Sequence, residues 1–218
     1  AGVGKSALVR AWSAGAANRS RVLWGACDPL TSPRPLGPLV DVAPELAPRV
    51  GELLRSGERD GLFEATLDSL TDGDPTVLVI EDLHSLSNRD ALMGLGDVVT
   101  RLPHGVRCLV STRRDPPWTL RRLRLDGRLV ELRGTDLAFH EDEARQLLTA
   151  VSERSLTDHD VEVLTERTDG WAVGLQLAGI SLRHQSDVSA AIASFTGGDR
   201  LIAEFLLEEV LEELAPEI

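Results

Sequence analysis

An α/β fold, in which a parallel sheet is followed by a small all-helical region, is predicted by two features of this 218-residue sequence. Short apolar runs alternate with helical patterns over the first two thirds of the chain, and such alternation is typical of βαβ units with parallel strands. After Gly134 the period changes, and only helical patterns follow. No run approaches the roughly eighteen consecutive apolar residues of a membrane span, so none is expected.

The elements of the sheet follow one another in a regular order. Residues 6–16 repeat apolar side chains at helical spacing, Leu8 and Trp12 among them. Runs rich in strand formers predict strands at residues 21–27, 76–82, 107–113 and 128–134. Further helices are expected near Leu39 and over residues 61–70 and 89–102. Proline is frequent in residues 28–38, which are therefore expected to form an ordered loop.

Helices are expected over residues 139–148, 157–167 and 171–183 of the second region. Thr157 and Asp160 have the spacing of a capping box, and Asp169–Gly170 is expected to form a turn. The last eighteen residues hold six glutamates and no basic residue, which predicts a helix with an acidic outer face. The expected divisions are a core at 1–136, a helical lid at 137–198 and the start of a following, truncated helical domain at 199–218.

The composition excludes some functions. A net charge of −12 repels a phosphate backbone, so this chain is not expected to bind nucleic acid by itself. Cys27 and Cys108 are far apart and lack the spacing of metal ligands. We therefore expect two free thiols in a cytoplasmic protein without a signal peptide.

The opening stretch, "AGVGKSALVR", has the pattern of the end of a phosphate-binding loop. Around Gly2, Val3 and Gly4 the backbone can turn tightly and point its N–H groups at phosphate oxygens. The ammonium of Lys5 would lie between the β- and γ-phosphates, the hydroxyl of Ser6 would bind Mg²⁺, and Ala7 would continue into a helix. Lys5 is the only lysine among 23 basic residues. This favours a phosphate-binding loop over the alternative interpretation, a glycine-rich helix start, because arginine does not easily replace a compact ammonium between two phosphates.

Two acids end the clearest strand. Glu81 and Asp82 follow "VLVI", and ligands of open α/β sheets bind at the carboxyl edge of the strands. One carboxylate would hold Mg²⁺, and the other would orient or deprotonate a water aimed at the γ-phosphate. The residue types leave open which acid takes which role. Arg113 ends the next strand, where it would contact the γ-phosphate or simply be a solvated strand end.

The segments "AGVGKS", "VLVIEDLH" and "LVSTRRDP" resemble the Walker A, Walker B and sensor-1 segments of STAND-type P-loop ATPases, which are relatives of AAA+ proteins. "CDPLTSPRPLGPL", "LRGTDLAFHEDEARQLL" and "TERTDGWAVGLQLAGISLR" are similar to the ATPase of large bacterial LuxR-type regulators, the maltose-regulon activators among them. The resemblance implies a P-loop sheet, a helical lid, ADP in a resting form, and opening by ATP and an inducer. It also implies self-oligomerisation and DNA binding by a C-terminal domain absent here.

Several positions depart from the family pattern. Glu81 stands where the first acid is usually aspartate, and the lid helix lacks the usual proline, so we expect Trp171 and Leu175 to be lid core. His84 could approach the site, but we expect it to be a packed or surface residue. The family's first strand is expected to be missing from the chain, so that this segment alone would fold poorly and bind nucleotide weakly.

The predicted function is an ATP-binding regulatory module of a transcriptional regulator, which switches between ADP and ATP states and is a slow Mg²⁺-dependent ATPase in the full-length protein. Two alternatives share the same motifs. One is an AAA+ motor or loader of the origin-recognition type, against which the acidic charge weighs. The other is a degenerate nucleotide-binding scaffold that does not hydrolyse ATP.

Overall fold

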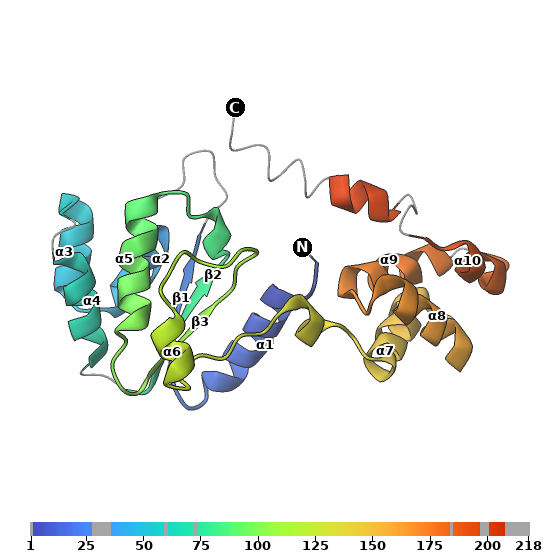
Figure 1. Ribbon diagram of the computed structural model, residues 1–218, viewed down its shortest axis with the longest axis horizontal. Helices are drawn as coiled ribbons and strands as arrows, with labels where there is room; N and C mark the ends of the chain where they lie inside the picture. Colours follow the sequence, from blue (N-terminus) through green and yellow to red (C-terminus); the bar gives the residue numbers. More distant parts are fainter. Residues whose placement is uncertain are drawn as a thin grey trace. The chain divides into compact units, whose positions relative to one another are not determined.

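The computed structural model describes residues 2–27, 36–58, 61–71, 74–183, 185–196 and 201–207. The chain divides into two compact units (Figure 1). The sheet unit is Ser6–Val130, and the helical unit is Ala1–Lys5 together with Glu131–Ile218. A parallel sheet and a following helical region are both present, so the predicted fold class is confirmed.

Three parallel strands form the sheet, with β2 between β1 and β3. The strands are β1 (Arg21–Ala26), β2 (Thr76–Glu81) and β3 (Val106–Val110). The register aligns Ala26 of β1 with Glu81 of β2, and Ile80 of β2 with Val110 of β3. All residues of β2 are buried, which agrees with its continuous apolar run and its central place.

Helices connect and cover the strands. They are α1 (Lys5–Ala16), α2 (Gly37–Val42), α3 (Pro48–Ser56), α4 (Leu62–Thr71), α5 (Arg89–Thr100) and α6 (Arg121–Leu125), with 3₁₀ turns at Ala43–Glu45 and Leu83–Ser85. The sequence pattern predicted α1, α2, α4 and α5, but gave no helix for α3. It missed the short α6, because five residues are too few to show a helical period.

The two faces of the sheet bury different sets of side chains. On one face Val77 and Val79 of β2 pack with Val9 of α1. On the other face Leu78 and Ile80 join the larger core, which includes residues of α2–α5. Figure 1 shows α1 and the α2–α5 group on opposite sides of the strands. Because side chains alternate along a strand, odd-numbered residues of β2 point toward α1.

One glycine allows α2 to approach the sheet closely. A Cβ on Gly25 of β1 would lie 2.5 Å from the carbonyl oxygen of Pro38, closer than real Cβ atoms come to a backbone oxygen. Any larger residue at Gly25 would therefore push α2 away from the strand.

The helical unit consists of a 3₁₀ turn and four helices, followed by helical residues 201–207. The elements are Gly134–Leu137, α7 (Glu141–Ser152), α8 (Asp158–Thr168), α9 (Ala172–Leu182) and α10 (Val188–Ser194). Leu148, Leu164 and Leu175 are fully buried at its centre, and Trp171 packs against them partly buried. The expectation that Trp171 and Leu175 belong to this core is confirmed.

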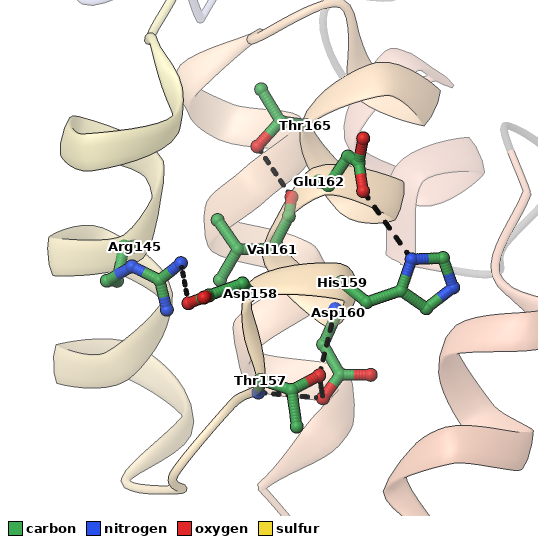
Figure 2. Close-up of polar contacts among 8 residues, drawn as sticks. All are labelled: Arg145, Thr157, Asp158, His159, Asp160, Val161, Glu162 and Thr165. Carbon is green, nitrogen blue, oxygen red and sulfur yellow. Dashed lines mark hydrogen bonds and ion pairs between the residues drawn. The ribbon is translucent and has the colours of Figure 1, made fainter.

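Polar contacts fix the start of α8 (Figure 2). The Thr157 hydroxyl accepts the N–H of Asp160 at 3.2 Å, and Asp160 Oδ2 accepts the Thr157 N–H at 2.9 Å, so the predicted capping box is confirmed. The guanidinium of Arg145 on α7 lies 2.7 Å from Asp158 Oδ1 and ties the two helices together. The predicted turn is also present, since Asp169 and Gly170 both have positive φ.

The strand predicted at 128–134 is wrong. Residues 128–133 form no regular element and pair with no strand among the described residues, and a 3₁₀ turn begins at Gly134. Val130 is 84% exposed and Leu132 60% exposed. Alternating apolar side chains favour extended backbone, but a strand also needs a neighbouring edge for its N–H and C=O groups.

Several predictions lie outside the described residues: most of the loop at 28–38, parts of the turns at 72–75 and 196–199, and the acidic segment after residue 207. Within the described residues no helix is both long and apolar enough to cross a membrane. Neither Cys27 nor Cys108 forms a disulfide, as predicted, and burial raises the pKa of the Cys108 thiol to about 12.

Candidate functional site

The loop before α1 depends on its glycines. Gly2 and Gly4 have φ of 69° and 83°, a left-handed region that other residues rarely adopt. The Gly2 carbonyl accepts the N–H of Val173 at 3.2 Å, and a Cβ on Gly2 would lie 2.7 Å from Val173 Cγ2. Position 2 therefore requires glycine for both conformation and space. Val3 and Gly4 lead directly into Lys5, the first residue of α1.

Chain connection places the start of α1 at the carboxyl edge of the strands. Four residues join the end of α1 to the start of β1, so the helix runs antiparallel to the strands. Val9 packs with Val77 and Val79. From Val9 the helix continues about 4.5 Å back to Ser6, while β2 continues about 7 Å from Val79 to Glu81. Ser6 and Glu81 therefore both lie toward the carboxyl edge of the strands, on the same face of the sheet. Ala7 follows Ser6 in the first turn of the helix.

Glu81 is the most unusual side chain at this edge. It is the last residue of β2, lies in the odd-numbered series that faces α1, and is only 6% exposed. Its Oε1 atom is buried and accepts no hydrogen bond from any described residue. Because an unpaired buried carboxylate oxygen is costly, this atom indicates a missing cation or donor.

Asp82 lies outside the strand in a different environment. Its backbone is left-handed, with φ 54° and ψ 44°, and its side chain is 45% exposed. Its N–H donates to Ser111 Oγ at 3.0 Å. Oδ1 of Asp82 lies 3.9 Å from Nδ1 of His84, a side chain only 16% exposed. The two adjacent acids therefore differ in burial and in neighbours.

One of these neighbours was given no role from the sequence. His84 was expected to be a packed or surface residue that could approach the site, and it is 16% exposed and lies beside Asp82. Ser111 received no role, although it is buried and binds the backbone of Asp82. A polar residue directly after an apolar strand, next to a strand that ends in acids, was the available signal for Ser111.

Arg113 lies further from the strand than the pattern indicated. β3 ends at Val110, and Arg113 is exposed in the turn that follows. The neighbouring Thr112 donates its hydroxyl to the carbonyl of Arg114 at 2.8 Å, which shapes this turn. Arg113 is thus on a loop at the carboxyl edge rather than on the strand itself.

The donor set suits a magnesium ion that also binds phosphate. The described residues contain no cluster of three or more His, Cys, Asp and Glu side chains that could hold a metal alone. Glu81, Asp82 and Ser6 offer hard oxygen ligands at one edge of the sheet unit. Mg²⁺ commonly takes one or two carboxylates and completes its shell with waters and substrate phosphates. The unpaired Glu81 oxygen fits such an ion.

Comparison with known proteins gives relatives of two kinds. The chain is 33% identical over 181 residues to the serine/threonine-protein kinase PknK of Mycobacterium tuberculosis, covering 81% of this chain and 16% of that protein. It is 26% identical over 226 residues to the HTH-type transcriptional regulator MalT of Yersinia enterocolitica and over 230 residues to that of Serratia proteamaculans. These two matches cover 98% and 100% of this chain and 25% of each regulator.

The chain thus spans a quarter or less of the length of these relatives. No protein-family model matches it. Similarity to MalT regulators over nearly the whole chain confirms the predicted resemblance to the ATPase segment of LuxR-type regulators of the maltose-regulon kind.

Proposed function

With that similarity as the premise, we propose that the chain is the ATP-binding regulatory ATPase module of a transcriptional regulator and switches between ADP and ATP states. The observation that carries this proposal is the buried, unpaired Glu81 oxygen at the edge where α1 begins. Bound Mg²⁺ would supply a positive partner for this oxygen, and ATP would supply the phosphoryl group that reacts.

The loop and the start of α1 would hold the phosphates. Gly2, Val3, Gly4 and Ala7 contribute backbone N–H groups, and the N-terminus of α1 favours negative charge. Lys5 contributes a compact ammonium to the phosphate oxygens. Ser6 contributes a hydroxyl to the metal. These roles use only groups that belong to the loop and the first turn of the helix.

Glu81 and Asp82 would divide the metal and water roles. Glu81 shares the α1 face with Ser6 and has the unpaired oxygen, so we assign it to Mg²⁺. Asp82 is half exposed beside His84, so its carboxylate can accept a proton from a water and pass it to solvent. We propose this assignment for the choice that the residue types left open. Arg113, on the adjacent loop, would contact the γ-phosphate.

The regulatory part of the proposal rests on the relatives. The printed names of the MalT proteins describe HTH-type transcriptional regulators, so we propose that DNA is bound through a further domain of the full protein. The helical unit would act as the lid, and inducer binding and self-oligomerisation would follow the nucleotide state. We place this activity in the cytoplasm.

Substitution of Lys5 tests the proposal in the full-length protein. Lys5→Ala should weaken ATP binding by about 100-fold or more, since a charge-assisted phosphate contact is lost. Arg10→Ala, which removes an exposed basic residue from the same helix, is the matched control and should leave affinity unchanged. Calorimetry with MgATP measures both. Equal affinity of the Lys5→Ala variant and the wild type would refute nucleotide binding by this loop.

A further inference from the structure

We infer that Ser111 is a positioning residue that holds Asp82 in its left-handed conformation and thereby fixes the direction of the Asp82 carboxylate. This inference rests on the proposed function, because it concerns the water-orienting acid of that site. Its basis is an irregularity in the hydrogen bonds between the ends of β2 and β3.

Continuation of the register beyond Ile80 and Val110 places Ser111 opposite Glu81. In a regular parallel ladder the Ser111 N–H would donate to the carbonyl of Ile80, and the Ser111 carbonyl would accept the N–H of Asp82. The first bond is present at 2.9 Å. The second is replaced, because the Ser111 carbonyl accepts the N–H of Leu83 at 2.9 Å instead.

One extra residue, Asp82, is therefore inserted into β2 as a bulge. The insertion leaves the N–H of Asp82 without its ladder partner. Ser111 Oγ accepts that N–H at 3.0 Å. The serine hydroxyl thus replaces the backbone carbonyl that the bulge has displaced, and Ser111 binds the chain on both sides of Asp82.

The conformation of Asp82 needs such support. A non-glycine residue at φ 54° is uncommon, although aspartate tolerates it better than most residues. Ser111 is only 4% exposed, so water cannot easily take the place of its hydroxyl. Strained backbone persists where surrounding bonds determine it, and such positions concentrate at functional sites. Without the hydroxyl, the turn at Asp82 can relax and move the carboxylate.

The test compares Ser111 variants in the full-length protein by steady-state ATP hydrolysis. Ser111→Ala should lower kcat by about tenfold or more and change KM less than about twofold, because only the reacting geometry is lost. Ser111→Thr, which keeps the hydroxyl, should recover most of kcat. Ser111→Cys is close in size but a weak acceptor, so it should behave like Ser111→Ala and replaces that variant if it does not fold.

Ser69→Ala is the matched control, because Ser69 Oγ also accepts a backbone N–H, that of Ala47 at 2.8 Å, between α4 and the segment before α3. It should lower thermal stability without a change in kcat. A double-mutant cycle with Asp82→Asn gives the second readout. If Ser111 acts through Asp82, Ser111→Ala should lower kcat less than about twofold in the Asp82→Asn background.

Full kcat in Ser111→Ala and Ser111→Cys, or independent multiplication of the two effects in the cycle, would overturn the inference. A wild-type protein that neither binds nor hydrolyses MgATP would instead overturn the proposed function. The two failures are therefore distinguishable by the behaviour of the wild type.

Discussion

The two units treat their buried polar groups differently. In the sheet unit several buried side-chain atoms have no hydrogen-bond partner among the described residues: Ser13 Oγ, Arg21 Nε and Nη2, and Glu81 Oε1. Within the described part of the helical unit no buried side-chain nitrogen or oxygen is left in this state. Native proteins satisfy nearly all such groups, and of these atoms Glu81 Oε1 lies at the carboxyl edge where the proposed ligand would bind.

In the helical unit, arginine and acidic side chains bind the backbone groups at the ends of the helices. Arg167 Nη1 donates to three carbonyls around the end of α10, those of Ile192, Ala193 and Phe195, at 2.6–3.0 Å. Arg183 donates to the carbonyl of Val151 near the end of α7. A capping box begins α8, and at the start of α7 Glu143 Oε2 accepts the N–H of His140 at 3.0 Å. The helical unit is therefore stabilised by contacts of its own, whereas Glu81 Oε1 at the carboxyl edge of the sheet unit has no partner among the described residues.

The largest expected effect tests whether the helical unit depends on its own core. Leu164→Ala removes a fully buried side chain from α8 and should destabilise the helical unit by about 2–5 kcal/mol. Hydrogen exchange should show lost amide protection in α7–α10 and unchanged protection in β1–β3. Equal loss of protection in both units would show that they are not separately stabilised.

An intermediate effect tests the unsatisfied edge of the sheet unit. Glu81→Leu replaces a buried carboxylate that has an unpaired oxygen and should raise the free energy of unfolding by about 1–3 kcal/mol without nucleotide and metal. The same variant should lose any stabilisation by MgATP. Thermal denaturation with and without MgATP measures both. Glu52→Leu, an exposed acid on α3, is the control and should show neither change. A destabilised Glu81→Leu variant would show that Glu81 has a structural partner.

The smallest expected effect tests the caps of the helical unit. Thr157→Ala removes the hydroxyl that accepts the Asp160 N–H and should cost about 1 kcal/mol of stability. Thr165→Ala on the same helix removes a hydroxyl that bonds only to the carbonyl of Val161, one turn earlier, so it is a matched control. Urea denaturation of both variants gives the difference. Equal stability of the two variants would mean that the capping box contributes nothing.

The sequence predicted the central elements because their signals are local. Residues 76–82 were predicted as a strand because a continuous apolar run suits a strand that is buried on both faces. The cap formed by Thr157 and Asp160 was predicted because it lies within four residues. The tight turn at Gly2 and Gly4 was predicted for the same reason, since glycine adopts a left-handed backbone without a distant partner.

The errors arose where a structure depends on distant partners. Residues 128–134 have strand-forming side chains but pair with no neighbouring strand among the described residues. Ser111 was missed, because its role comes from a bulge on another strand, 29 residues away in sequence. The burial of Glu81 against the exposure of Asp82 depends on which face each residue takes, and two adjacent acids look equivalent in a sequence.

The left-handed backbone at Asp82 also limits the amino acids that this position can hold. Glycine, asparagine and aspartate are the residues that adopt this conformation most readily, and β-branched residues almost never do. Of the two acidic residues, the shorter one is therefore the better choice at 82, while Glu81 on regular strand backbone has no such restriction. The aspartate at 82 thus has a conformational reason, whereas the glutamate at 81, where the family usually has aspartate, is not explained by the backbone. A search for similar sites in other sequences should accept either acid at the strand end, but at the next position it should favour aspartate.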